Sequence, residues 1–255
     1  MTLAARLGIA ALLGCTALVP AARAQTTVDA LGGFTVTATP AAVSDYLFRG
    51  ISQTRGRPAA QLTLDIEHSS GIYIGGFVSN VAWPTSTPEV NIRQEVDFLA
   101  GYRFTLADTK FDAGFVYYTY PGYRIAPGGF EWSWYAFALR ASREFGPFKL
   151  LGSAFYSPNF NYRSGDALYV EGGFDLAAGD SGVTLSARAG YQWVERNPRW
   201  GAPDYAVFSV SASREIAFGV IGAVTFSHTT LDRADCFGGA KICGTRVVAS
   251  LSRPF

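Results

Sequence analysis

The sequence predicts an all-β fold, a transmembrane antiparallel up-and-down β-barrel of about twelve strands. Three observations lead to this prediction. The chain begins like an exported protein, and no apolar run long enough for a membrane-spanning helix follows that start. Polar and apolar residues then alternate in segment after segment. The connections between these segments alternate between short and longer, as they do in outer-membrane barrels.

The first 24 residues are typical of a secretory signal peptide. Arg6 supplies a positive start, residues 7–19 are apolar, and Ala22-Arg23-Ala24 is a small-x-small cleavage site. Cys15 ends a weak lipobox-like run, but the apolar stretch continues past it. We therefore expect a cleaved signal peptide at 1–24, a short N-terminal segment at 25–32 and an outer-membrane barrel at 33–255.

Charge and cysteine content restrict the classes of function. The chain has 21 Lys and Arg against 20 Asp and Glu, and two of the bases belong to the leader. A nearly neutral mature chain argues against nucleic-acid binding. Cys236 and Cys243 remain after the leader, in one Gly-containing segment. In an exported protein such a pair predicts a short disulfide-closed loop, with two free thiols as the alternative.

Twelve segments have the alternation expected of strands. In residues 61–67, Leu62 and Leu64 share one face while Asp65 and Glu67 share the other. A strand of this kind has one apolar and one polar side, which suits lipid outside and water inside. The expected strands are residues 34–49, 61–67, 72–83, 95–104, 110–120, 130–143, 148–157, 168–176, 183–194, 205–215, 220–231 and 245–255.

The first strand is expected to reach Arg49, with Pro40 marking a bulge or bend. At its end Asp45 and Arg49 share one face, and Tyr46 and Phe48 share the other. Aromatic residues outside and charged residues inside would place this strand end at the extracellular mouth.

The connections are short after even-numbered strands and longer after odd-numbered ones. A membrane barrel with both termini on one side has this arrangement, and its closure leaves no sheet edge in lipid. The chain ends in Phe255, an ending that suits barrel-assembly machinery, although Arg253 and Pro254 make it irregular. We therefore expect the bacterial cell outer membrane as the location, with its lipid and the barrel-assembly machinery as partners. The sequence leaves the oligomeric state open.

Two motifs resemble a known family. Residues 43–54 read Val-Ser-Asp-Tyr-Leu-Phe-Arg-Gly-Ile-Ser-Gln-Thr, and residues 71–81 read Gly-Ile-Tyr-Ile-Gly-Gly-Phe-Val-Ser-Asn-Val. Both resemble the TorF-type porin family, an exported bacterial family of unknown function, and the likeness covers most of the mature chain. The resemblance implies an outer-membrane location and a porin role. It implies no defined substrate and no catalytic residues.

Charged residues on the polar faces are expected to point into the lumen. They could line a water column that selects solutes, or pair across the lumen and close it as a structural barrel. Because eight strands are just filled by side chains and diameter grows with strand number, we favour a porin-like channel for passive diffusion of small polar solutes or ions. Asp45, Arg49 and Asn80 are expected to meet at an outer constriction. The candidate pore-lining residues are Asp45, Arg49, Asp65, Glu67, Asn80, Glu95, Asp97, Arg103, Glu171, Asp175, Arg188 and Arg246.

Aromatic residues are expected in two girdles at the membrane interfaces. The lipid side of segment 130–143 stays unassigned, because Trp134 and Arg140 share a face. The upper candidates are Tyr46, Phe48, Trp83, Tyr118, Trp132, Trp134, Tyr156 and Trp193, and the lower candidates are Phe34, Phe104, Phe148 and Phe255.

Catalytic chemistry has little support. The chain has two histidines, His68 beside an expected periplasmic turn and His228 towards the outer end of a strand, with Thr230 on the same face. A barrel enzyme acting on lipid with His228 as base is an alternative, and an interfacial histidine is the simpler interpretation. No N/S metal cluster or phosphate-binding loop occurs. We predict no enzyme, no metal site and no cofactor.

Overall fold

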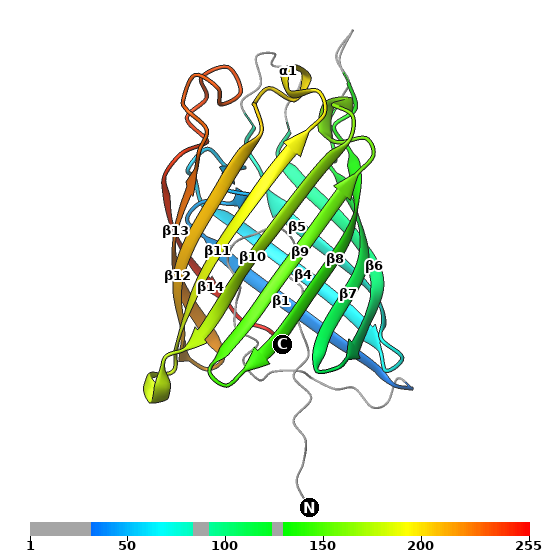
Figure 1. Cartoon of the computed structure of the whole chain (residues 1–255), viewed down its shortest axis with the longest axis vertical. Helices are drawn as coiled ribbons and strands as arrows, with labels where there is room; N and C mark the ends of the chain where they lie inside the picture. The colour runs from blue at the N-terminus through cyan, green and yellow to red at the C-terminus, as the bar shows by residue number, and fades with distance from the viewer. Residues whose placement is uncertain (1–31, 84–91, 124–129) are drawn as a thin grey trace, which may run out of the picture.

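Twelve long strands close into one antiparallel barrel in the computed structural model, which describes residues 32–83, 92–123 and 130–255 (Figure 1). The predicted twelve-stranded barrel is therefore confirmed. The expected signal peptide lies outside the described residues. The barrel strands are β1 Phe34–Val43, β4 Ala59–His68, β5 Ile72–Asn80, β6 Gln94–Leu106, β7 Thr109–Thr119, β8 Trp134–Phe145, β9 Phe148–Ser157, β10 Ala167–Ala177, β11 Val183–Val194, β12 Tyr205–Ala217, β13 Val220–Thr229 and β14 Arg246–Ser252.

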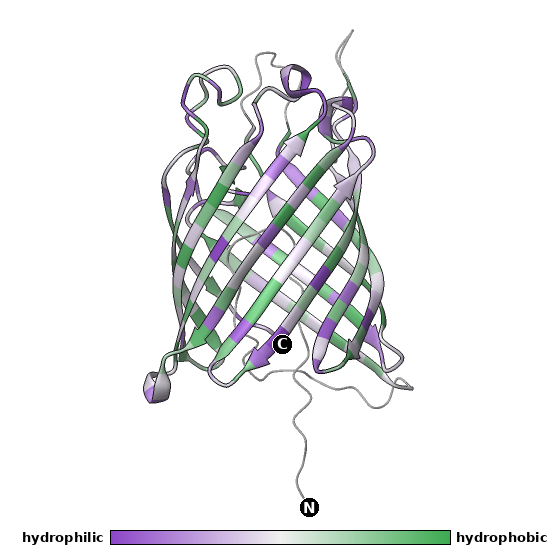
Figure 2. Ribbon diagram, viewed as in Figure 1, coloured by the Kyte–Doolittle hydropathy of each residue, from purple (hydrophilic) through white to green (hydrophobic). Residues whose placement is uncertain are grey.

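Hydrophilic and hydrophobic residues alternate along the strands of the barrel wall (Figure 2). On β5, Ile72, Ile74 and Val78 are exposed, whereas Tyr73 and Phe77 are buried. This follows from the two-residue period of a strand, which sends successive side chains to opposite faces. The outer surface of the barrel is consequently rich in Leu, Ile, Val and Phe, and the charged residues of the strands gather inside.

Short turns lie at one end of the barrel, and α1 (Asn197–Trp200) lies with the longer loops at the other (Figure 1). We call these the turn end and the loop end. Two further single turns, η2 (Asn161–Arg163) and η3 (Gly179–Ser181), complete the described helical segments, and none of the described helices is long and apolar enough to cross a membrane. Gly71 makes the β4–β5 turn with a φ of 95°, and a Cβ there would lie 2.1 Å from the carbonyl oxygen of Arg103. A larger residue is thus excluded from this turn.

The barrel closes between β1 and β14. The β1–β4 register runs without interruption from Phe34 opposite His68 to Val43 opposite Ala59, so the bulge expected at Pro40 is absent. Pro40 fits because its missing N–H is not needed, while its carbonyl accepts a hydrogen bond of 3.1 Å from the Arg253 amide.

The C-terminal residue extends this closure. The backbones of Ala38 and Phe255 exchange hydrogen bonds of 3.2 and 2.9 Å beyond the end of β14.

Residues 44–58 differ most from the sequence prediction. β1 ends at Val43 instead of continuing to Arg49, and the chain folds inward as a hairpin of β2 (Leu47–Phe48) and β3 (Ile51–Ser52). We call residues 45–54 the plug hairpin, because most of their side chains are buried against the inner wall.

The tip of the plug hairpin explains its geometry. Arg49 and Gly50 have φ values of 48° and 78°, as a two-residue type I′ turn requires. A Cβ at Gly50 would lie 2.5 Å from a methyl of Thr229 and 2.7 Å from a methyl of Val207, so the turn presses directly on the wall.

The expected aromatic girdles are matched at the turn end and largely wrong at the loop end. The four lower candidates are exposed, and so are Tyr156 and Trp193. The even positions of β8 point inward, so Trp134 is buried and Phe137 takes the outer face. The upper candidates that pack inside instead of facing lipid are Tyr46, Phe48, Trp83, Tyr118, Trp132 and Trp134.

Candidate functional site

The base of the plug hairpin is held by Asp45. Its carboxylate accepts hydrogen bonds from the hydroxyls of Ser52 and Thr54 and forms an ion pair of 3.2 Å with Arg246 of β14. Asp45 therefore stabilises the hairpin internally and also ties it to the wall. Asp45 and Arg49, expected to meet at an outer constriction, have different partners, because the hairpin turn places Arg49 beside Gln192 while Asp45 pairs with Arg246.

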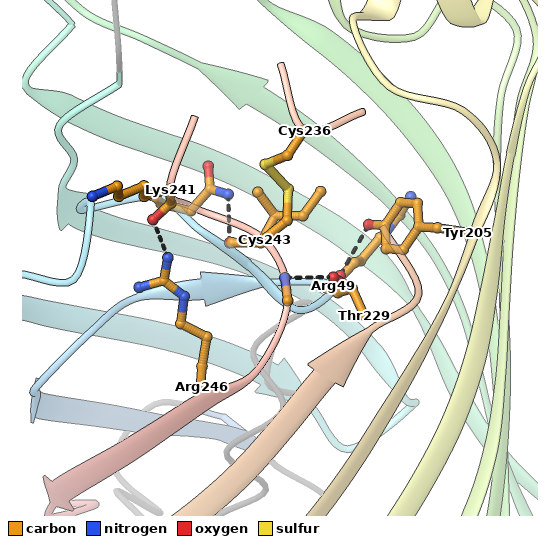
Figure 3. The surroundings of a disulfide bond; sticks show 10 residues. Arg49, Tyr205, Thr229, Cys236, Lys241, Cys243 and Arg246 are labelled. Carbon is orange, nitrogen blue, oxygen red and sulfur yellow. Dashed lines mark hydrogen bonds between the residues drawn. A yellow bond between two sulfur atoms is a disulfide. The ribbon is translucent and has the colours of Figure 1, made fainter. Parts of the chain in front are cut away.

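Arg49 anchors the tip of the plug hairpin on β11 and β12. The side chain is only 3% exposed, and its Nη1 donates to Oε1 of Gln192 on β11. The hydroxyl of Tyr205 on β12 donates to the Arg49 carbonyl at 2.9 Å (Figure 3). Aromatic rings surround the guanidinium, which suits a desolvated cation. The guanidinium carbon lies 4.4 Å from the ring centroid of Tyr169, 4.7 Å from Phe48, 5.3 Å from Phe155, 5.9 Å from Trp134 and 5.9 Å from Phe160.

The loop before β14 packs against the plug hairpin at the loop end. Its two cysteines form the predicted disulfide, Cys236–Cys243. Between them, the carbonyl of Ile242 accepts a hydrogen bond of 2.8 Å from the Ser52 amide. Arg246 also donates to the Lys241 carbonyl beside the disulfide (Figure 3). The disulfide-closed loop therefore holds the hairpin in place from above.

Aromatic packing fills the rest of the loop end. Trp132 contacts the rings of Trp83 and Tyr162, with centroids 5.5 and 4.5 Å apart. Trp200 of α1 contacts Phe237 of the disulfide loop at 5.3 Å. These contacts join loops that are distant in the sequence, so the loop end is a packed cluster around the hairpin.

Below the plug hairpin, towards the turn end, ion pairs cover one side of the inner wall. Arg103 pairs with Asp65 at 2.7 Å and with Glu67 at 2.5 Å. Asp112 lies 3.7 Å from Arg103 and 3.2 Å from Arg140, which links β4, β6, β7 and β8. A separate ion pair joins Asp175 and Arg188, and Glu171 accepts a hydrogen bond of 2.7 Å from Tyr169.

Small hydroxyl side chains cover the other side of the inner wall. They come from β12, β13, β14 and β1, and many are almost fully buried. A wall of short polar side chains facing a wall of paired charges gives the interior a hydrophilic lining. The buried hydroxyl residues of this wall are Thr39, Ser209, Ser213, Thr225, Ser227, Thr229 and Ser252.

Glu95 and Asp97 of β6 point into the barrel and form no ion pair within the described residues. Glu95 accepts a hydrogen bond of 2.8 Å from the Tyr46 hydroxyl, which makes it another anchor of the plug hairpin. Both Asp97 carboxylate oxygens are buried without a hydrogen-bond partner in the described part of the chain.

The structure places the candidate pore-lining residues unequally. Those on β4, β6, β10, β11 and β14 all point inward. Asn80 is the exception, since it lies on the exposed face of β5 and accepts a hydrogen bond of 2.8 Å from the Ala60 amide. The expected constriction of Asp45, Arg49 and Asn80 is therefore wrong, because a strand's alternation sends Asn80 outward.

The sequence prediction missed several interior residues. Asp112 and Arg140 complete the ion-pair network, while Gln192 and Tyr169 hold Arg49. All four lie on the inner faces of strands whose alternation is visible in the sequence. That alternation was sufficient to predict that Asp112 and Arg140 point into the barrel. Nothing local marks Gln192 or Tyr169, because their role depends on the inward hairpin.

The possible catalytic histidine is not paired as expected. His228 is exposed on the outer face, and its Nδ1 lies 2.9 Å from the hydroxyl of Thr245. Thr230 is occupied elsewhere, since its hydroxyl accepts a hydrogen bond of 3.0 Å from the Ala206 amide. The described residues contain no group of three or more His, Cys, Asp or Glu side chains placed to hold a metal ion.

Comparison with protein-family models identifies the family of the chain. The model of a bacterial family, described as "Bacterial protein of unknown function (Gcw_chp)", matches residues 27–255. The chain belongs to this family. No curated protein matches the Gcw_chp chain in a sequence search.

Two solved barrels share the fold of the Gcw_chp chain. One, "KdgM porin in complex with disordered oligogalacturonate", is 11% identical with a TM-score of 0.54, covering 86% of this chain and 98% of that one. The other, "NanC porin structure in rhombohedral crystal form", is 9% identical with a TM-score of 0.53, covering 85% of this chain and 97% of that one. At these identities the similarity establishes the fold alone, a closed antiparallel β-barrel.

Proposed function

We propose that this protein is a narrow porin-like channel of the bacterial outer membrane, for passive diffusion of small polar solutes or ions. The observation that carries the proposal is the closed barrel with an apolar outer surface and a hydrophilic lining. A lipid-facing surface of this kind needs a bilayer, and the outer membrane is where bacteria place such barrels. The resemblance to the TorF-type porin family agrees with this function. Outer-membrane lipid and the barrel-assembly machinery are then the expected partners.

The plug hairpin defines how such a channel would work. It is packed at the loop end together with the aromatic cluster, so we infer that it restricts any path through the barrel. Solutes that pass it meet the paired charges on one side and the hydroxyl wall on the other. Asp65, Glu67, Arg103, Asp175 and Arg188 are therefore our proposed pore-lining residues below the hairpin. Size would be restricted at the hairpin, and polarity would be favoured below it.

Liposome swelling tests this proposal. Proteoliposomes that carry the folded protein should swell in small sugars or amino acids and should not swell in large oligosaccharides. Planar-bilayer recordings should show small, discrete conductance steps. If folded protein gives no flux above that of empty liposomes, the channel is ruled out. The closed structural barrel, which the packed loop end favours, would then be the function to pursue.

Enzymatic action on lipid is not part of the proposal. His228 and Thr245 lie at the outer surface, where lipid could reach them, but the described residues provide no third group that orients the His228 ring. A histidine needs such a partner to activate a hydroxyl nucleophile efficiently. Incubation with phospholipid and lipid A, followed by mass spectrometry, should therefore show no product.

A further inference from the structure

The acid pair Glu95 and Asp97 on β6 has no arginine or lysine partner among the described residues. Asp65, Glu67, Asp112 and Asp175, which also point into the barrel, each pair with an arginine. Glu95 and Asp97 are 2% and 1% exposed, and their positions two residues apart put both side chains on the inner face. Their carboxyl groups are close enough to interact with each other. No ion pair joins either acid to a Lys or Arg within the described residues. Two buried like charges need a counter-charge.

Tyrosine hydroxyls surround this acid pair. Tyr46 donates to Glu95 from the plug hairpin at 2.8 Å. Tyr118 lies directly opposite Asp97 in the β6–β7 register, is 1% exposed, and its hydroxyl has no hydrogen-bond partner in the described chain. Both carboxylates also lie within electrostatic range of Tyr118 and of Tyr120. The unsatisfied oxygens at this point are thus both Asp97 carboxylate oxygens and the Tyr118 hydroxyl. Arg49 and Arg140 also lie within electrostatic range of Tyr118, but their guanidinium groups hydrogen-bond to Gln192 and Asp112 instead of to the acid pair.

Oxygen atoms without donors are the ligands of a hard cation. Ca²⁺ and Mg²⁺ bind negatively charged carboxylates together with neutral oxygen groups, and two carboxylates match a divalent charge. We propose that Glu95 and Asp97 bind one divalent cation, with Ca²⁺ as the best fit, beneath the plug hairpin. The Tyr46 and Tyr118 hydroxyls lie beside it. Ca²⁺ suits the site better than Mg²⁺ because it tolerates irregular ligand geometry.

The site also connects the cation to the plug hairpin. Tyr46 is part of the hairpin, and its hydroxyl contacts Glu95 directly. A bound cation fixes the Glu95 carboxylate and so fixes the hydrogen bond that Tyr46 donates to it. Occupancy of the site therefore favours the docked hairpin.

Terbium luminescence tests the site on the mature protein in detergent. Tb³⁺ replaces Ca²⁺ and emits when a nearby tyrosine or tryptophan is excited, and Tyr118 and Trp134 are stacked with ring centroids 3.9 Å apart near the site. We expect sensitised emission that Ca²⁺ displaces. The double variant Glu95→Gln/Asp97→Asn should bind Tb³⁺ at least tenfold more weakly.

The barrel offers a matched control. Asp65 and Glu67 are also two residues apart on an inner face, but both pair with Arg103. The variant Asp65→Asn/Glu67→Gln should keep the Ca²⁺-displaceable emission. Heat-dependent migration on gels verifies that each variant is folded, and the single variant Asp97→Asn replaces the double variant if that one does not fold.

Three results would overturn the proposal. Wild-type protein could show no emission that Ca²⁺ displaces, in which case the two acids share a proton. The β6 variant could bind Tb³⁺ as tightly as wild type, or both double variants could lose binding equally. A rise in the thermal unfolding midpoint with added Ca²⁺, seen in wild type and absent in the β6 variant, would be a second confirmation. Neither readout requires the barrel to conduct.

Discussion

Replacing Arg49 with alanine should release the plug hairpin and open the channel. The substitution removes the hydrogen bond to Gln192 and the contacts with the surrounding aromatic rings, while the barrel strands keep their pairing. A hydrogen bond that involves a charged group contributes about 1.5–3 kcal/mol. A desolvated cation–π contact contributes about 2 kcal/mol.

These contributions do not add fully, because alanine also removes the cost of burying the cation. We take a net loss of about 3 kcal/mol in hairpin docking, which lowers the docking equilibrium about 100-fold. The hairpin should then spend a much larger fraction of time undocked.

Single-channel recording in planar bilayers measures this change. Arg49→Ala should show more frequent or larger openings than wild type, and should admit larger sugars in liposome swelling. Arg143→Ala is the matched control, since Arg143 lies at the turn end, pairs with exposed Asp108 and does not contact the hairpin. If Arg49→Ala has the conductance and noise of wild type, the hairpin does not limit the channel and this reasoning is refuted.

Three further changes test other parts of the structure. Gly50→Ala forces a Cβ against the wall in a left-handed turn and should cost hairpin docking about 2 kcal/mol, so recordings should resemble those of Arg49→Ala; wild-type currents would argue against it. Cys236→Ser/Cys243→Ser should destabilise the disulfide loop by about 2 kcal/mol. In proteoliposomes, limited proteolysis should then cleave the loop end of the variant barrel faster than that of wild type, and equal cleavage rates would contradict this. Arg103→Met leaves three acids without a shared partner and should lower the free energy of unfolding by about 3 kcal/mol, which an unchanged urea midpoint would disprove.

The sequence alone determined the barrel. Strand alternation such as Leu62 and Leu64 against Asp65 and Glu67 has a period of two, so it fixes both the element type and the side that faces water. The alternating connection lengths predicted the up-and-down topology. Consecutive strands that pair as antiparallel neighbours need only short turns at one end of the barrel, and longer loops can gather at the other end. The disulfide followed from two cysteines in one exported loop. These features are local, and local features can be read along the chain.

Only the tertiary structure decided the path of residues 44–58. Tyr46 and Phe48 alternate with Asp45 and Arg49 as a strand end would, and the pattern cannot distinguish lipid from a packed interior. The inward turn depends on partners far away in the sequence, namely Gln192, Tyr205 and Arg246. Both environments are apolar to an aromatic ring, so hydrophobicity gives the same signal for each. The contacts that separate them exist only once the barrel has closed.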